Sequence, residues 1–194
     1  MEPAVLHRRS VESWRSRLDA VEESHWTLPT PCTEWDVRAL VNHVVGEELW
    51  TVPLVDGATL EEVGDRFDGD VLGDDPRAVG SVAATEAAAA VDRRLPEGGT
   101  VRVSFGVISI EEYVRQLSAD HLVHSWDLAV ATHQDPSLDP ELVREVSEWF
   151  LEREEMYRDA GAVGPAGPTS DDPQAALLAA FGRGSGAPPD DEAG

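Results

Sequence analysis

The sequence contains no lysine and only one cysteine, Cys32, among its 194 residues. One cysteine cannot form a disulfide within the chain, which fits a reducing compartment. The absence of lysine excludes a Schiff-base lysine and the lysine of a phosphate-binding P-loop. No segment approaches the ~20 consecutive apolar residues of a membrane-spanning helix, and the first residues lack the apolar core of a secretory signal. We therefore expect a cytoplasmic protein.

Basic residues are also scarce, because 15 arginines stand against 38 acidic residues and leave a formal net charge of −23. Nucleic-acid-binding proteins carry a basic stripe, and anionic membranes attract basic segments. We expect neither kind of partner. The hydrophobic share of 41% is sufficient for one sizeable core. We expect one domain over residues 1–183 and a disordered tail, rich in glycine and proline, over residues 184–194.

Hydrophobic periodicity and capping residues predict mostly helices. The expected helices span about 3–23, 33–50, 75–95, 109–132 and 139–158, with shorter helical segments at 60–67 and 172–181. Thr33 with Asp36, and Ser109 with Glu112, have the spacing of capping boxes. Residues 100–107 form the one segment with clear strand character. The predicted fold class is all-α: a four-helix bundle with a short β element and an extra C-terminal helix.

Two of the predicted helices carry side chains that suit a metal ion. Asp120 and His124 are four residues apart, so both project from one face of a helix. His43 lies at the edge of the apolar face of another helix, and a bundle can place it opposite that pair. Two nitrogens, one carboxylate and an open position form a catalytic type of zinc site. A hydrogen bond between Asp120 and His124 explains the spacing equally well, and His121 is an alternative partner for His124.

The remaining histidines, His7, His25 and His133, are expected at the surface because no ligand-type residues accompany them. Cys32 is expected to be a small, buried thiol. A reactive cysteine needs positively charged surroundings, and only Arg38 is near it in the sequence.

Three side chains close to the candidate ligands have two interpretations each. Asp127 either binds an arginine or a backbone amide, or orients His124 as a hydrogen-bond acceptor. Of these two roles we prefer the first. Glu47 is expected on a solvated face, with a fourth ligand or a general base as the alternative. Trp126 packs in the bundle or lines a pocket beside His124.

Three stretches of the sequence, TPCTEWDVRALVNHVVGE, DHLVHSWDLAVAT and LLAAFGR, resemble a known family. They are similar to the actinobacterial metal-binding branch of the DinB/YfiT-like superfamily, and to the N-terminal domain of mycothiol-dependent maleylpyruvate isomerase. The resemblance covers residues 10–183. It implies a four-helix bundle that holds a divalent metal, zinc or nickel, through positions that correspond to His43, Asp120 and His124. The family often has Glu or His at the position of Asp120, whose side chain is shorter than Glu by one methylene.

The resemblance also implies a low-molecular-weight thiol cofactor such as mycothiol. The leading hypothesis is a metal-dependent transferase or isomerase that joins such a thiol to a small electrophile. The alternatives are a non-catalytic, stress-related metal-binding module and a metal-dependent hydrolase. Maleylpyruvate isomerisation itself is not predicted, because we expect no room in this chain for the second domain of that isomerase. The metal, the electrophile and the formation of a homodimer stay open.

Overall fold

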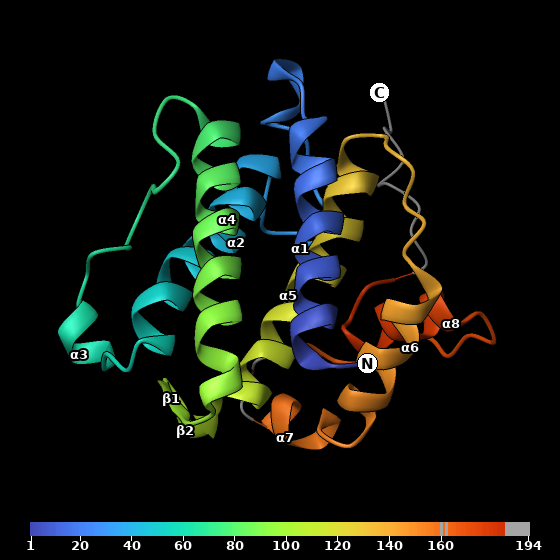
Figure 1. The fold of residues 1–194 in the computed structure, drawn as a ribbon. Helices are drawn as coiled ribbons and strands as arrows, with labels where there is room; N and C mark the ends of the chain where they lie inside the picture. Colours follow the sequence, from blue (N-terminus) through green and yellow to red (C-terminus); the bar gives the residue numbers. More distant parts are fainter. Residues whose placement is uncertain (160, 162, 185–194) are drawn as a thin grey trace, which may run out of the picture.

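The computed structural model describes residues 1–159, 161 and 163–184. Four long helices form the bundle (Figure 1): α1 (Pro3–Asp19), α2 (Val37–Val55), α4 (Pro76–Arg94) and α5 (Ile110–Ala131). Helix α1 packs against α4 and α5, and α2 packs against the same two helices. The predicted all-α class with a short β element is therefore confirmed.

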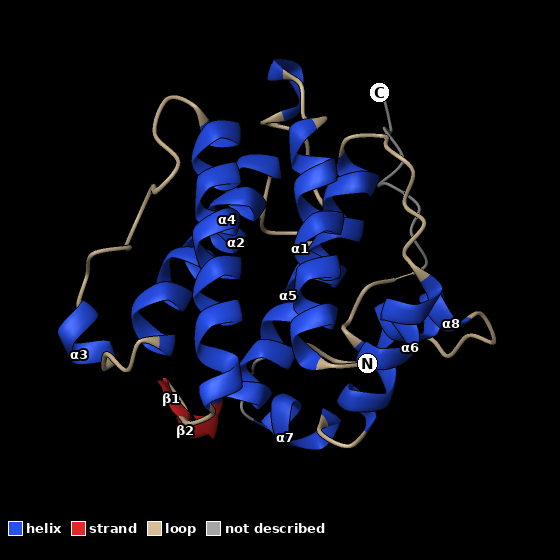
Figure 2. Ribbon diagram, viewed as in Figure 1, coloured by secondary structure: helices blue, strands red, loops and turns tan. Residues whose placement is uncertain are grey.

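Shorter elements surround the bundle, and helix dominates the described chain, apart from one small hairpin (Figure 2). The hairpin pairs β1 (Thr100–Val103) with β2 (Gly106–Ser109) in antiparallel register, at the place where the sequence predicts a strand. The other elements are α3 (Leu60–Val63), α6 (Pro140–Leu151), α7 (Glu154–Asp159), α8 (Pro173–Ala180) and two single 3₁₀ turns at Glu23–His25 and Leu95–Glu97. None of the described helices is long and apolar enough to cross a membrane.

Helix α5 is the centre of the molecule, since 16 of its 22 residues are buried. One side of the helix meets a cluster of buried apolar side chains that includes Trp14, Val41 and Leu128. The other side meets a second cluster, formed with α6 and α8, that contains Trp126 and Phe150. In Figure 1, α6 and α8 lie on the side of the bundle away from α4. A helix covered on both sides can hold polar side chains in fixed positions, because their rotamers are confined by packing.

Several predicted helix ends differ from the structure. Helix α1 ends at Asp19, four residues earlier than expected. The N-cap of α2 is Asp36, which accepts the N–H of Ala39 at 2.8 Å, so the capping role predicted for Thr33 is wrong. Helix α2 also continues past residue 50 to Val55 with Pro53 inside it. The free energy gained by burying the last turn, with Leu54 and Val55, compensates for the backbone hydrogen bond that the proline removes. Tertiary packing here overrides local helix preference.

The helix predicted over residues 139–158 is two helices, α6 and α7, with a turn between them. Ser109 caps α5 as predicted, but the Glu112 carboxylate does not complete the capping box. It accepts hydrogen bonds from Trp149, Arg153 and Tyr157 instead, on both sides of that turn. The ion pair between Glu112 and Arg153 therefore stabilises this turn. Local sequence preference could not indicate the turn, because the two residues are 41 positions apart. The predicted disordered tail lies, from residue 185 onward, outside the described residues.

Candidate metal centre and its cavity

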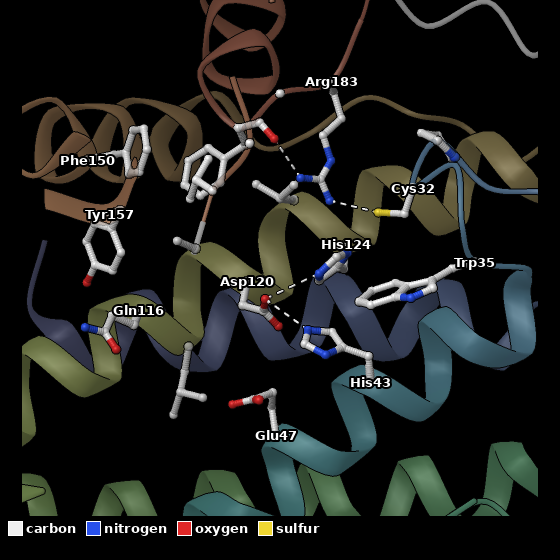
Figure 3. Close-up of a pocket in the computed structure, with 18 of the residues that line it drawn as sticks. Cys32, Trp35, His43, Glu47, Gln116, Asp120, His124, Phe150, Tyr157 and Arg183 are labelled. Carbon is white, nitrogen blue, oxygen red and sulfur yellow. Dashed lines mark hydrogen bonds and ion pairs between the residues drawn. The ribbon is translucent and has the colours of Figure 1, made fainter. Parts of the chain in front are cut away.

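Three predicted ligand residues, His43 from α2 with Asp120 and His124 from α5, meet on the wall of one cavity (Figure 3). We call them the His–Asp–His cluster. Oδ1 of Asp120 lies 3.5 Å from Nε2 of His43 and 3.3 Å from Nε2 of His124. One donor atom from each residue lies within 4.8 Å of the other two. Two imidazole nitrogens and one carboxylate thus converge from two packed helices, as the sequence predicts.

The ring of His124 is oriented by a buried carboxylate. Its Nδ1 lies 2.9 Å from Oδ2 of Asp127, which is completely buried. Arg183 donates to both oxygens of Asp127, at 3.2 and 2.6 Å. An ionised carboxylate only accepts, so Nδ1 of His124 carries a proton, and Nε2, which faces Asp120, is the nitrogen that can bind a metal once it loses its own proton. Asp127 therefore both binds an arginine and orients His124, so both interpretations that the sequence allowed for it are correct.

The electrostatics of the cluster follow from its burial. Burial alone would raise the pKa of Asp120, but the charges and hydrogen bonds of His124 and His43 hold that pKa well below its usual range. Burial would lower the pKa of His124, but Asp120 and Asp127 outweigh it and raise the pKa well above its usual value. Asp120 is therefore an anion, which is the form that binds a cation.

The donor set fits a divalent metal ion. Oδ2 of Asp120 is buried and has no hydrogen-bond partner among the described residues, which is costly for a carboxylate oxygen without a cation. Trp35 lies against His43 with a ring-centroid distance of 4.8 Å and confines its ring. Two nitrogens and one oxygen are ligands that zinc and nickel both accept.

The cavity in front of the cluster has a volume of about 800 Å³ and two unlike ends. Polar side chains surround the His–Asp–His cluster, and aromatic side chains from α6, α7 and the residues after α8 line the other end (Figure 3). Glu47 lies on this wall half-buried, so the solvated face expected for it is wrong. Burial and the charge of Asp120 raise the pKa of Glu47. Trp126 does not line the cavity among the described residues; it packs in the core.

His121 points away from the cavity and is not a candidate ligand. Its Nε2 lies 3.0 Å from Oε1 of Glu48, and its Nδ1 donates to the carbonyl of Leu117 at 2.6 Å. The side chains of His121 and Glu48 are 1% and 0% exposed. The alternative in which His121 replaces Asp120 is therefore contradicted by its position.

His7 is buried, so the surface position predicted for it is wrong. It lies edge-on to His121 with a centroid distance of 5.8 Å, and neither of its nitrogens has a described hydrogen-bond partner. Burial, with the charge of His121, lowers the pKa of His7 to about 3. A signal for this position existed, because His7 continues the apolar spacing of Val11, Trp14 and Leu18 by one turn.

Cys32 is half-buried on the cavity wall and not fully enclosed as expected. Nη2 of Arg183 lies 3.1 Å from its sulfur, and the thiol donates to Oδ2 of Asp127 at 3.4 Å. The positive charge beside Cys32 thus comes from a residue 151 positions away, and sequence neighbours could not reveal it. Arg183 is the site residue that the residue-level prediction missed. Its one signal is its place at the end of the LLAAFGR stretch.

The fold and the site define a helical bundle with a candidate metal centre between the second and fourth of its long helices, α2 and α5. Residues 7–129 match the family model described as the mycothiol maleylpyruvate isomerase N-terminal domain. The match spans more than half of the chain, and the chain belongs to this family.

Two curated relatives come from Mycobacterium tuberculosis: the uncharacterized protein Rv0738 of strain H37Rv and the uncharacterized protein MT0763 of strain CDC 1551. Each is 34% identical over 150 residues, which cover 75% of this chain and 75% of the relative. No solved structure matches the chain significantly.

Proposed function

We propose that this protein binds a divalent metal ion through His43, Asp120 and His124, and that it joins a low-molecular-weight thiol to a small electrophile. The observation that carries the proposal is the convergence of three donor atoms on a cavity wall, beside a buried carboxylate oxygen without a partner. Membership in the mycothiol-related family supports mycothiol, or a similar thiol, as the cofactor. Zinc is the proposed metal, with nickel as the alternative.

When bound, a divalent ion supplies the positive charge that deprotonates a coordinated thiol. The chain's own residues prepare the site for it. Asp127 keeps a proton on Nδ1 of His124, and Asp120 supplies one negative charge between His43 and His124, whose Nε2 atoms must be free of protons to bind a metal. Glu47, whose pKa is raised, is the candidate acceptor for the proton that the thiol loses. Thiol chemistry of this kind suits a reducing cytoplasm, which we propose as the location.

The ligand assignment is tested by elemental analysis of protein purified without chelators and without a histidine tag. His43→Ala, Asp120→Ala and His124→Ala should each lose most of the bound metal, because each removes one of three protein ligands. His133→Asn is the matched control, since His133 is exposed, does not line the cavity, and has a positive φ of 58° that asparagine tolerates. Metal retained by all three variants would reject the site.

The chemistry is tested by mixing the metal-loaded protein with an electrophile, with and without the thiol. We expect consumption of the electrophile that requires both metal and thiol. Glu47→Gln should keep the metal and lose turnover. Consumption without any thiol would indicate a hydrolase. A protein that binds metal but consumes no electrophile under either condition would be a binding module.

A further inference from the structure

The two ends of the cavity differ in chemistry, and this difference restricts the substrate. We propose that the cavity takes an uncharged molecule with a flat apolar group, and that it rejects molecules with a free carboxylate. The inference deepens the proposed function and rests on it for the statement that the bound molecule is an electrophile.

The end of the cavity away from Cys32 is built from aromatic rings. Phe150 lies 4.2 Å from Phe181 and 6.1 Å from Tyr157, measured between ring centroids, and the rings of Phe150 and Tyr157 are inclined by only 27°. Trp149 lies 5.6 Å from Tyr157. These rings pack against one another and form one aromatic wall of the cavity, and such a wall favours a flat apolar group because burial and ring stacking both contribute.

Among the described residues that line the cavity, Arg183 is the one arginine, and both ring nitrogens of His124 already face the carboxylates of Asp120 and Asp127. All three nitrogens of Arg183 already donate hydrogen bonds: Nε and Nη2 to Asp127, and Nη1 to the carbonyl of Phe181. Nη2 also contacts the sulfur of Cys32 (Figure 3). The chain has no lysine, and residues 160, 162 and 185–194 include no arginine. The charge of Arg183 is thus already compensated by Asp127, and a substrate carboxylate at the aromatic end, beside Phe150 and Tyr157, meets no cationic side chain among the described lining residues.

The acidic side chains Glu34, Glu47 and Asp120 line the same cavity. A carboxylate placed at the aromatic end would lose its hydration without gaining a partner, which is strongly unfavourable. The polar group available at that end is neutral. Gln116 lies beside Tyr157 in Figure 3, and its Nε2 is buried without a described hydrogen-bond partner. An amide can bind a carbonyl oxygen or a hydroxyl group without requiring charge.

Binding of unreactive ligands tests this selectivity directly. The probes are benzylacetone, its para-carboxylate derivative and butanone, which lacks the ring, and the readout is titration calorimetry. The protein is used as purified and again after treatment with a chelator, because a carboxylate could bind a metal ion directly. We expect benzylacetone to bind about tenfold or more tightly than either other probe in the chelated protein. Equal or tighter binding of the carboxylate would overturn the proposal.

Two variants make the test specific to this cavity. Gln116→Arg places a cation at the aromatic end and should reverse the preference in favour of the carboxylate derivative. Ala89→Arg, an exposed position on α4, is the matched control and should leave the preference unchanged. Phe181→Ala should weaken benzylacetone binding, whereas Val82→Ala, also exposed, should not. Unchanged binding in both Gln116→Arg and Phe181→Ala, with folding confirmed by circular dichroism, would place the ligand elsewhere.

A second arm separates this inference from the proposed function. Benzylideneacetone and its para-carboxylate derivative are supplied to the metal-loaded protein with a thiol. The sulfur adds to the β-carbon and the thiol proton ends on the α-carbon, so the addition needs no oxidant and releases no leaving group. We expect faster addition to the neutral ketone. If benzylacetone binds more tightly than the other two probes but no thiol is added to either ketone, the thiol chemistry alone is rejected. If the thiol is added but the probes do not bind in that order, the selectivity alone is rejected.

Discussion

Nδ1 of His124 lies 2.9 Å from Oδ2 of Asp127, while Nε2 of the same ring lies 3.3 Å from Oδ1 of Asp120. One imidazole therefore connects a buried carboxylate, paired with Arg183, to a carboxylate on the cavity wall. The first contact determines the tautomer, and the tautomer determines which nitrogen can bind a metal.

Replacing Asp127 with Asn should weaken metal binding without removing a ligand. Outer hydrogen-bond partners of metal-ligating histidines contribute about 10–100-fold to affinity, and we expect a loss of this size. The measurement is competition with a chelator of known affinity, at several pH values. Asp171→Asn, an exposed change of the same type, is the control. An unchanged affinity in folded Asp127→Asn protein would show that the contact does not orient the ligand.

Replacing Glu48 should affect stability and leave the metal site intact. Glu48→Ala leaves His121 buried without its charged partner, which costs about 3–5 kcal/mol of the free energy of unfolding. Glu47→Ala is the matched control at the preceding residue of α2, and we expect a loss below about 1 kcal/mol because its side chain faces the cavity. Urea denaturation and metal analysis of both variants are the measurements. Loss of metal from folded Glu48→Ala protein would contradict this separation.

Burial of His7 should make stability depend on pH. Its folded pKa, about 3, lies below its unfolded value of 6.5, so the unfolded chain binds the additional proton between these pH values. His7 therefore destabilises the fold as pH falls below 6.5, by about 1.4 kcal/mol per pH unit. The slope should shrink in His7→Leu and persist in His133→Asn, measured by denaturation at pH 4–7. An identical slope in all three proteins would reject the assignment.

Cys32→Ser should keep most of the thiol-dependent turnover. The proposed nucleophile belongs to the added thiol, whereas Cys32 contacts Arg183 and Asp127 on the cavity wall. Turnover and metal content of this variant are measured together. A folded, metal-loaded Cys32→Ser protein without any turnover would instead make Cys32 the nucleophile.

Two helical glycines should respond in opposite directions to alanine. A Cβ at Gly80 would lie 2.6 Å from Cδ2 of Leu18, a completely buried side chain, and 3.3 Å from Cγ2 of Val45. We expect Gly80→Ala to destabilise the fold by about 1–3 kcal/mol. A Cβ at Gly46 meets nothing within 4 Å, so Gly46→Ala should stabilise α2 by up to about 1 kcal/mol. Thermal unfolding compares them, and equal shifts would show that α1, α2 and α4 do not meet closely at Gly80.

The periodicity and caps of the sequence were enough to predict the long helices of the bundle and the place of a short β element, because those signals act within a few residues. Asp36 and the 139–158 segment show the limit of this approach. The N-cap of α2 lies three residues after Thr33, where the sequence predicts it, and the break between α6 and α7 has no local signal because Glu112, which holds it, lies on another helix.

The sequence by itself determined that Asp120 and His124 share a face of α5, because their spacing matches one helical turn. Only the tertiary structure decided that His43 meets them, that His121 turns into the core, and that Arg183 reaches Asp127. The physical reason is that helical geometry acts over four residues, whereas partners 56 to 151 positions apart are chosen by how the helices pack and which charges must be paired when buried.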